Sequence, residues 1–176
     1  MLDDDDGGEG EGGGPTPVSK YILPGDPISG TLCISANVRS FVSSSKQDEL
    51  MKLISKYPNT AVICLQELWD LVGPYPIIPG FQPLVCKTRQ GKGGGGVGIY
   101  VRENIDFKTI SSPFLESKLE TIAIDLYLNK HKMTRLINLY IPPGVKLEDT
   151  LSHLDLLPVK KNNCFLVGDF NLNQYN

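Results

Sequence analysis

Two kinds of hydrophobic pattern alternate along this chain of 176 residues. Short, continuous apolar runs are typical of strands that are buried on both faces of a sheet. Four such runs occupy residues 31–36, 61–65, 97–101 and 164–167. They predict four core strands.

Two other segments have apolar residues at helical spacing. In the first, Ser45 is the expected N-cap, Asp48 and Glu49 are expected in the first turn, and Pro58 stops the helix. The second helix is expected over residues 146–157. Its apolar stripe consists of Leu147, Thr150, Leu151 and Leu154.

Residues 120–128 and 132–141 predict an antiparallel hairpin. The first of these strands alternates strictly, which places Ile122, Ile124 and Leu126 on one face. The order of the predicted elements is strand, helix, strand, several strands, helix and strand. This order indicates an α/β sandwich of sheets that helices cover.

A glycine-rich segment over residues 89–96 precedes the third core strand. A phosphate-binding P-loop is excluded there, because Lys92 is not followed by Ser or Thr and because a strand comes next instead of a helix. The segment therefore predicts a hairpin connection from a strand over residues 84–87. Its glycines would let the backbone approach a ligand closely, and Arg89 is a candidate substrate-binding residue.

Composition separates a tail from the rest of the chain. Residues 1–17 hold four consecutive aspartates, two glutamates and no aromatic residue, so they cannot bury enough apolar surface to become ordered. We expect a disordered, acidic, glycine-rich tail over residues 1–20 and one domain over residues 28–176. Residues 1–20 carry six acids and one lysine, a net charge of −5; the whole chain carries −3, so the remainder carries +2. This balance predicts no broad basic surface for nucleic acid.

Cysteine usage and hydropathy indicate the compartment. Cys33, Cys64 and Cys164 lie within apolar runs and are expected to be buried thiols in a reduced compartment, rather than a disulfide set or a zinc site. No apolar run approaches the roughly 18 residues of a membrane span, and the acidic start is unlike a signal peptide. We expect an intracellular protein of the nucleus or cytoplasm.

Five polar residues stand at or just past the ends of apolar strands: Asn37, Glu67, Tyr140, Asp169 and Asn171. Taken singly, each has an ordinary structural explanation as a turn residue, a solvated acid or a strand residue. Taken together, they stand where α/β folds have their active sites, because the loops at one edge of a rigid sheet lie close together.

Placing the carboxylates of Glu67 and Asp169 close together would be unfavourable without a cation. Two like charges ~4 Å apart repel by about 4 kcal/mol at an effective dielectric constant of ~20. A divalent ion removes this repulsion, and carboxylate and amide oxygens suit Mg²⁺, which takes only one or two protein carboxylates. The sequence therefore predicts a magnesium site that can polarise a phosphoryl oxygen.

Motifs in this order resemble those of the endonuclease/exonuclease/phosphatase superfamily. They are Asn37 after a strand, Leu65-Gln66-Glu67, Tyr140-Ile141-Pro142-Pro143 and Gly168-Asp169-Phe170-Asn171. Residues 94–102 resemble a strand of the LINE-type retrotransposon endonucleases, the reverse transcriptase-associated branch. The resemblance covers residues 31–171 and implies a partial DNase I-like α/β/β/α sandwich of four layers.

The resemblance also implies a magnesium-dependent phosphodiesterase that nicks DNA. It implies that Glu67 holds the metal, with Asn37 beside it. It further implies that Asp169 orients or deprotonates the attacking water, that Asn171 positions the phosphate, and that Tyr140 donates a hydrogen bond to it.

The chain departs from the family pattern after Asn171. In the family, a further segment ends in a Ser-Asp-His type motif whose histidine contacts the scissile phosphate, whereas this sequence ends at Asn176. The final strands are therefore expected to be missing. Neither His131, in a hairpin turn, nor His153, on a predicted helix, fits the motif, and both are expected at the surface. Glu120 matches an acidic family position before a strand, where a structural role is implied.

Three hypotheses about function remain open. The first is a retrotransposon-type DNA endonuclease with an incomplete active site and weak or absent activity. The second is a non-catalytic remnant that serves as a binding module, and the third is a product that does not fold alone. Within the superfamily, phosphoinositide and sphingolipid phosphodiesterases share the same metal site, so the strand-end residues do not select DNA.

Overall fold

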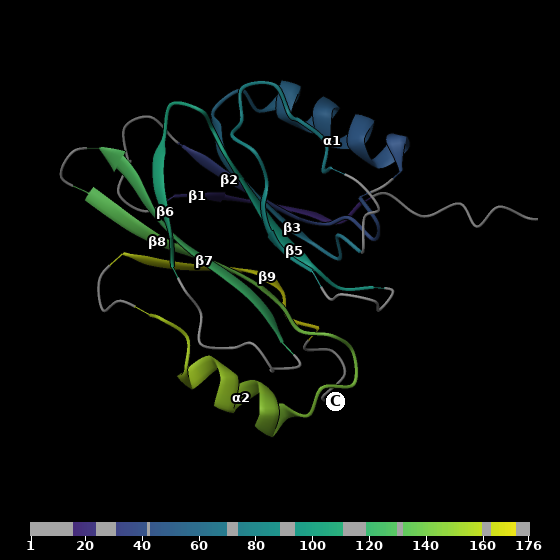
Figure 1. Cartoon of the computed structure of the whole chain (residues 1–176), viewed down its shortest axis with the longest axis vertical. Coiled ribbons are helices and arrows are strands. Elements are labelled where there is room, and N and C mark those ends of the chain that lie inside the picture. The colour runs from purple at the N-terminus through teal and green to yellow at the C-terminus, as the bar shows by residue number, and fades with distance from the viewer. Residues whose placement is uncertain are drawn as a thin grey trace, which may run out of the picture.

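Two β-sheets pack face to face, and one helix covers the outer side of each (Figure 1). The computed structural model describes residues 16–23, 31–41, 43–69, 74–88, 94–110, 119–129, 132–159 and 163–171. The four layers confirm the expected α/β/β/α sandwich.

The first sheet has the strand order β1-β2-β3-β5-β4. Its strands are β1 (Val18–Ile22), β2 (Leu32–Asn37), β3 (Thr60–Gln66), β5 (Val97–Val101) and β4 (Val85–Lys87). β2 and β3 run parallel, and the other neighbours run antiparallel. Helix α1 (Ser44–Lys56) makes the crossover between β2 and β3.

The second sheet has the strand order β6-β7-β8-β9. Its strands are β6 (Asp106–Ile110), β7 (Glu120–Asn129), β8 (Lys132–Tyr140) and β9 (Cys164–Asp169). β7 and β8 form the predicted hairpin, while β8 and β9 run parallel and are joined through helix α2 (Leu147–Asp155). The same device, a parallel pair joined by a helix, thus occurs once in each sheet.

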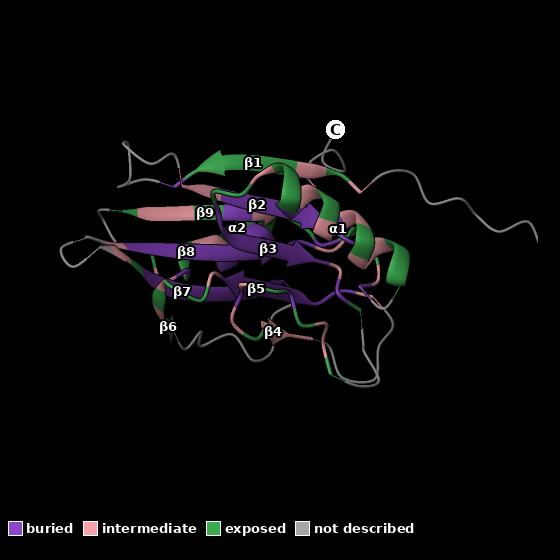
Figure 2. Ribbon diagram, turned by 90° about the horizontal axis from the view of Figure 1, so that it is seen from above, coloured by how far each residue is buried: buried purple, intermediate pink, exposed green. Residues whose placement is uncertain are grey.

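Strand β3 shows why its sequence is apolar without interruption. Val62 and Cys64 face the second sheet, and Ile63 and Leu65 face α1. Both faces are covered, so every position is buried (Figure 2). The predicted face of β7, with Ile122, Ile124 and Leu126, lies in the same core between the sheets.

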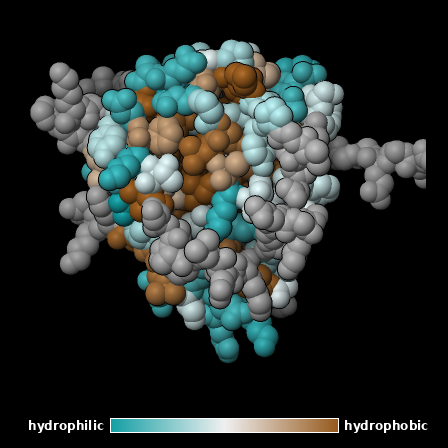
Figure 3. All heavy atoms as spheres, in the orientation of Figure 1, coloured by the Kyte–Doolittle hydropathy of each residue, from teal (hydrophilic) through white to brown (hydrophobic). Residues whose placement is uncertain are grey.

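This core reaches towards one side of the sandwich. Partly buried Val85, Ile105, Phe107 and Leu128 pack against it. Figure 3 shows apolar side chains gathered in the middle of the face seen there.

Among the helices in the described part of the chain, none is both long and apolar enough to cross a membrane.

The N-terminal boundary was predicted wrongly. Residues 18–20 belong to strand β1, which pairs with β2 at the exposed edge of the first sheet (Figure 2). Before it, Thr16 donates hydrogen bonds from its backbone N and its Oγ1 to the Glu49 carboxylate, at 3.1 and 2.6 Å. Pairing to β2 supplies the backbone partners that β1 lacks on its own, and the sequence of an exposed edge strand has no apolar run to reveal it.

Two details of the helices also differ from expectation. α1 begins at Ser44 with Ser43 as N-cap, so Asp48 lies beyond the first turn. In α2 the predicted stripe points partly outward, because Leu147 and Leu151 are 46% and 53% exposed.

His153 is buried, which corrects its expected place at the surface. Its Nε2 lies 3.0 Å from Thr121 Oγ1 on β7, and Thr150 is buried beside it on α2. This hydrogen bond lets α2 turn a polar residue towards the sheet. Burial lowers the pKa of His153, and the charge of Lys87 lowers it further.

The cysteines follow the prediction in part. Cys33 and Cys64 are fully buried on neighbouring strands, with their Sγ atoms 3.9 Å apart. Burial raises the pKa of the Cys64 thiol. Cys164 is only half-buried, because β9 is the outermost strand of its sheet among the described residues.

Candidate active site

The two parallel strand pairs deliver four of the predicted residues to one edge of the sandwich. Asn37 ends β2 and Glu67 follows β3, while Tyr140 ends β8 and Asp169 ends β9. Parallel neighbours end at the same edge of a sheet, and β9 contacts both β2 and β3 across the sandwich. The four side chains meet where the two edges come together.

The Asn37 amide links the two carboxylates. Its Nδ2 donates to Glu67 Oε1 and to Asp169 Oδ2, each at 2.7 Å. These two carboxylate oxygens are therefore separated by no more than twice that distance. The backbone N–H of Arg39 donates to Asn37 Oδ1 at 3.2 Å, which turns the NH₂ group towards the acids.

Tyr140 joins the pair from the second sheet. Its hydroxyl group hydrogen-bonds with Glu67. Burial raises the pKa of Tyr140, and the negative charge of Glu67, the hydrogen bond and the charges of Asp169 and Glu120 raise it further. The phenol is thus held in its protonated, hydrogen-bond-donating form.

Asn171 continues the site beyond β9. Its backbone φ of 45° is left-handed, and its N–H donates to Asp169 Oδ1 at 3.2 Å. Its side-chain Nδ2 donates to the Ile141 carbonyl at 2.8 Å, just after β8. The Asp169 carboxylate therefore accepts hydrogen bonds on both oxygens, from Asn37 and from Asn171.

Gly168 is required one residue before the acid. Its φ is 146°, and a Cβ at this position would overlap the Leu139 carbonyl of the neighbouring strand. The close approach of β9 to β8 directs Asp169 into the site.

A buried amide pair lies beneath these residues and was not predicted. Gln66 Nε2 donates to Asn138 Oδ1 at 2.6 Å, and Asn138 Nδ2 donates to the carbonyls of Leu65 and Gly98, each at 3.0 Å. Gln66 Nε2 also donates to Ser35 Oγ at 3.2 Å. The Gln66–Asn138 pair thus ties the sheets together one residue before Glu67 and two before Tyr140. A polar residue on the inward face of β8, between Leu136 and Tyr140, was the signal in the sequence.

Glu120 borders the site from β7, opposite Tyr140 in the β7–β8 register. It is buried, and its Oε2 accepts a hydrogen bond from the Gly96 N–H. A Cβ on Gly95 would collide with this carboxylate. Glu120 thus anchors Gly95 and Gly96, at the end of the glycine-rich connection that leads into β5. The predicted substrate-binding residue Arg89 and His131 lie outside the residues that the structure describes.

The loops after β2 and β3 are joined by backbone hydrogen bonds. Val38 N donates to Gln66 O at 2.9 Å, and Ser40 N donates to Glu67 O at 2.8 Å. Non-glycine residues here adopt the left-handed region, with φ of 42° at Arg39 and 55° at Glu67. Such strain persists where surrounding contacts enforce it, and it concentrates at functional sites.

A polar cavity of about 220 Å³ opens beside Asn37 and Asp169. Its lining comes from both sheet edges and from the start of the described chain. It consists of Pro17, Ser19, Ser35, Asn37, Arg39, Gln66, Gly168 and Asp169. The arrangement offers a polar recess that reaches Asn37 and the Asp169 carboxylate.

The donor set fits a magnesium ion. Glu67 and Asp169 present hard oxygen donors that converge from two sheets, and Asn37 offsets only part of their repulsion. Within the described ranges, no group of three or more His, Cys, Asp and Glu side chains could hold a metal ion. Mg²⁺ keeps several waters and needs only one or two protein carboxylates, so the pair suffices.

Comparison with known proteins places most of the chain in one family. Residues 34–174 match the family described as the Endonuclease/Exonuclease/phosphatase family. Among solved structures, the chain is similar to the crystal structure of humanized D. rerio TDP2 with 14 mutations, at 14% sequence identity and a TM-score of 0.49. The match covers 77% of this chain and 59% of the TDP2 chain, so this chain spans less than two thirds of the length of the TDP2 chain. Comparison with curated proteins found no match.

Proposed function

Because the chain belongs to the endonuclease/exonuclease/phosphatase family, we propose that it is a magnesium-dependent phosphodiesterase of the retrotransposon type that nicks DNA. The observation that carries this proposal is the Asn37 amide held between the carboxylates of Glu67 and Asp169. Two acids from separate sheets converge there, which suits a divalent cation and a phosphate.

Each residue has a role in this proposal. Glu67 would hold the ion, with Asn37 beside it, and the bound ion would polarise a phosphoryl oxygen. Asp169, oriented on both oxygens, would align the attacking water and accept its proton. Tyr140, kept protonated by its raised pKa, would turn its hydroxyl group from Glu67 and donate a hydrogen bond to a phosphate oxygen. Asn171 would position the phosphate through its side-chain amide.

We expect turnover to be slow. His153 lies on α2 and forms a hydrogen bond with Thr121. No other histidine is among the described residues, and no histidine contacts Asn37, Glu67 or Asp169 there. Among the described residues, Tyr140 and Asn171 would be the only hydrogen-bond donors to the phosphate, and they would stabilise the developing charge together with the bound ion. Removing one such donor typically costs enzymes about 10²–10³-fold in rate.

The test is Mg²⁺-dependent nicking of supercoiled plasmid by the whole chain, together with Mg²⁺ binding by calorimetry. Glu67→Gln should abolish both Mg²⁺ binding and nicking, and Asp169→Asn should remove nicking. Glu103→Gln, an exposed acid after β5, is the matched control and should change neither.

Two results would contradict the proposal. Nicking that survives Glu67→Gln would place the chemistry elsewhere. Mg²⁺ binding without any hydrolysis of phosphodiesters would indicate a binding module that retains the acidic pair.

A further inference from the structure

Trp69 lies on the rim of the candidate active site and is the one tryptophan of the sequence. Its indole Nε1 lies 3.5 Å from Glu67 Oε2. The side chain is nevertheless 39% exposed. A large aromatic surface therefore stands open to solvent next to a candidate metal ligand.

The backbone holds Trp69 in a strained conformation. Its φ is 60°, in the left-handed region that costs a bulky residue roughly 1–2 kcal/mol. The Trp69 N–H donates to Gly95 O at 2.8 Å, and the Leu68 N–H donates to Gly96 O at 3.2 Å. Leu68 is fully buried, so it anchors the loop while its neighbours Glu67 and Trp69 project from it.

This arrangement differs from that of an aromatic residue used for packing. The Leu68 side chain is buried in the core, whereas the Trp69 side chain stays 39% exposed although its backbone is strained. Strain observed beside candidate site residues is a reason to infer a function for the strained residue.

We infer that Trp69 is a stacking platform for an unpaired nucleobase beside the phosphate at Glu67. This inference rests on the proposed function and names the substrate class, which is single-stranded or locally unpaired nucleic acid. Stacking on an aromatic side chain contributes about 1–3 kcal/mol per base and tolerates any base. A base inside a duplex has both faces covered by its neighbours, whereas inositol phosphates and lipid headgroups offer no aromatic face.

The test uses the whole chain in Ca²⁺ with three probes: a short oligothymidylate, an abasic oligonucleotide of the same length, and inositol trisphosphate. Oligothymidylate should quench the tryptophan fluorescence. By anisotropy of labelled oligonucleotides, it should bind about 5- to 150-fold more tightly than the abasic probe, which is the stacking range expressed as affinity. Inositol trisphosphate should bind more weakly than either.

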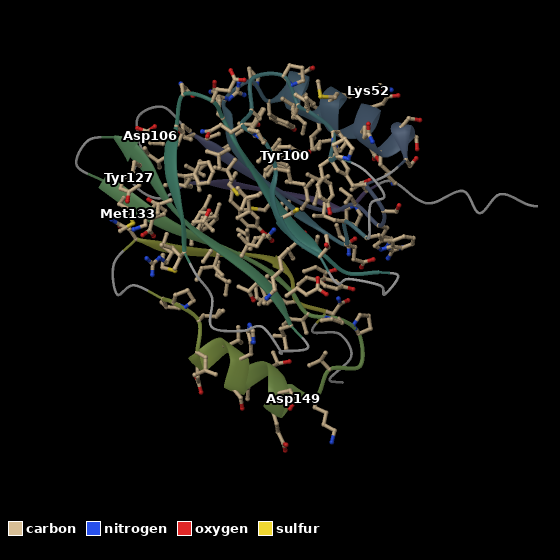
Figure 4. The ribbon with its side chains drawn as sticks, in the orientation of Figure 1. Lys52, Tyr100, Asp106, Tyr127, Met133 and Asp149 are labelled. Carbon is tan, nitrogen blue, oxygen red and sulfur yellow. The ribbon has the colours of Figure 1, made fainter. Side chains whose placement is uncertain are left out.

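Variants separate stacking from folding. Trp69→Ala should remove the preference for bases, and Trp69→Phe should retain most of it. Tyr127→Ala is the matched control, because Tyr127 is 44% exposed and lies near Met133, at the opposite end of β7 from Glu120 (Figure 4). It should leave the preference unchanged.

Equal affinity for the oligothymidylate and the abasic probe would overturn the inference, as would an unaltered preference in Trp69→Ala. Stronger binding of inositol trisphosphate would overturn it too. These outcomes are distinct from failure of the proposed function. Nicking that depends on Glu67 would stand if Trp69→Ala had no effect, and base-dependent binding without hydrolysis would retain the Trp69 inference alone.

Discussion

Replacing Asn138 with leucine tests whether the Gln66–Asn138 pair holds the two sheets in register at the site. Asn138 is fully buried and makes three hydrogen bonds, two as a donor to backbone carbonyls and one as an acceptor from Gln66. Leucine has the same branching and the same number of side-chain heavy atoms, so the shape of the side chain is kept while all three hydrogen bonds are lost.

The expected loss of stability follows from these contacts. A typical intramolecular hydrogen bond contributes about 1 kcal/mol net, so three contribute about 3 kcal/mol. Any buried group left without a partner adds about 1–3 kcal/mol, although Gln66 keeps its bond to Ser35. We therefore expect Asn138→Leu to lower the free energy of unfolding by about 3–6 kcal/mol. The double variant Gln66→Leu/Asn138→Leu should cost less than the sum of the singles, because it removes both partners together.

Equilibrium unfolding in urea, followed by circular dichroism, measures these losses. Ile137→Ala is a matched control for the site, because Ile137 is also fully buried on β8 but packs towards α2. It should cost a comparable 2–5 kcal/mol and leave Mg²⁺ affinity unchanged in the folded protein, whereas Asn138→Leu should weaken Mg²⁺ binding. A loss below about 1 kcal/mol, or strict additivity in the double variant, would refute this reasoning.

Three further substitutions probe other parts of the fold. Gly168→Ala should cost several kcal/mol or prevent folding in thermal melts, because its Cβ would meet a backbone carbonyl, whereas Gly144→Ala, at a φ of 79° with open space, should cost about 1–2 kcal/mol. Burial lowers the pKa of His153, so the stability from its neutral form is present above about pH 6.5 and is lost as the pH falls through the lowered value. His153→Gln should remove this acid dependence of the urea midpoint, and an unchanged dependence would assign it to other groups. Arg135→Ala should cost about 3–5 kcal/mol in urea, because it leaves the buried Asp125 carboxylate without its bidentate partner at 2.7 and 2.8 Å; Lys46→Ala, at a surface pair, should cost at most about 1 kcal/mol, and similar losses for both would contradict the distinction.

The local pattern of the sequence was sufficient to predict most of the strands. Continuous apolar runs predict strands covered on both faces, and the fully buried strands β3 and β5 confirm this. The run in β9 is an exception, because β9 is only partly buried and its Leu166 is 37% exposed. The same patterns placed Asn37, Glu67, Tyr140 and Asp169 at strand ends. Since parallel strands joined by a helix must end at a common edge, their convergence could be expected. Their chemical roles stay predictions.

Other features depended on contacts between distant segments. The face that α2 buries was set by the bond between His153 and Thr121, and strand β1 is defined by its pairing with β2. The hydrogen bond between Gln66 and Asn138 likewise joins residues that are far apart in sequence. The same holds for the hydrogen bond from the Trp69 N–H to the Gly95 carbonyl, which lies next to the strained backbone of Trp69. Hydrophobic periodicity reports which positions avoid water, because burial acts on each side chain through its own apolar area. It does not report which polar groups meet, because a buried hydrogen bond stabilises only when the folded chain has already brought both partners together.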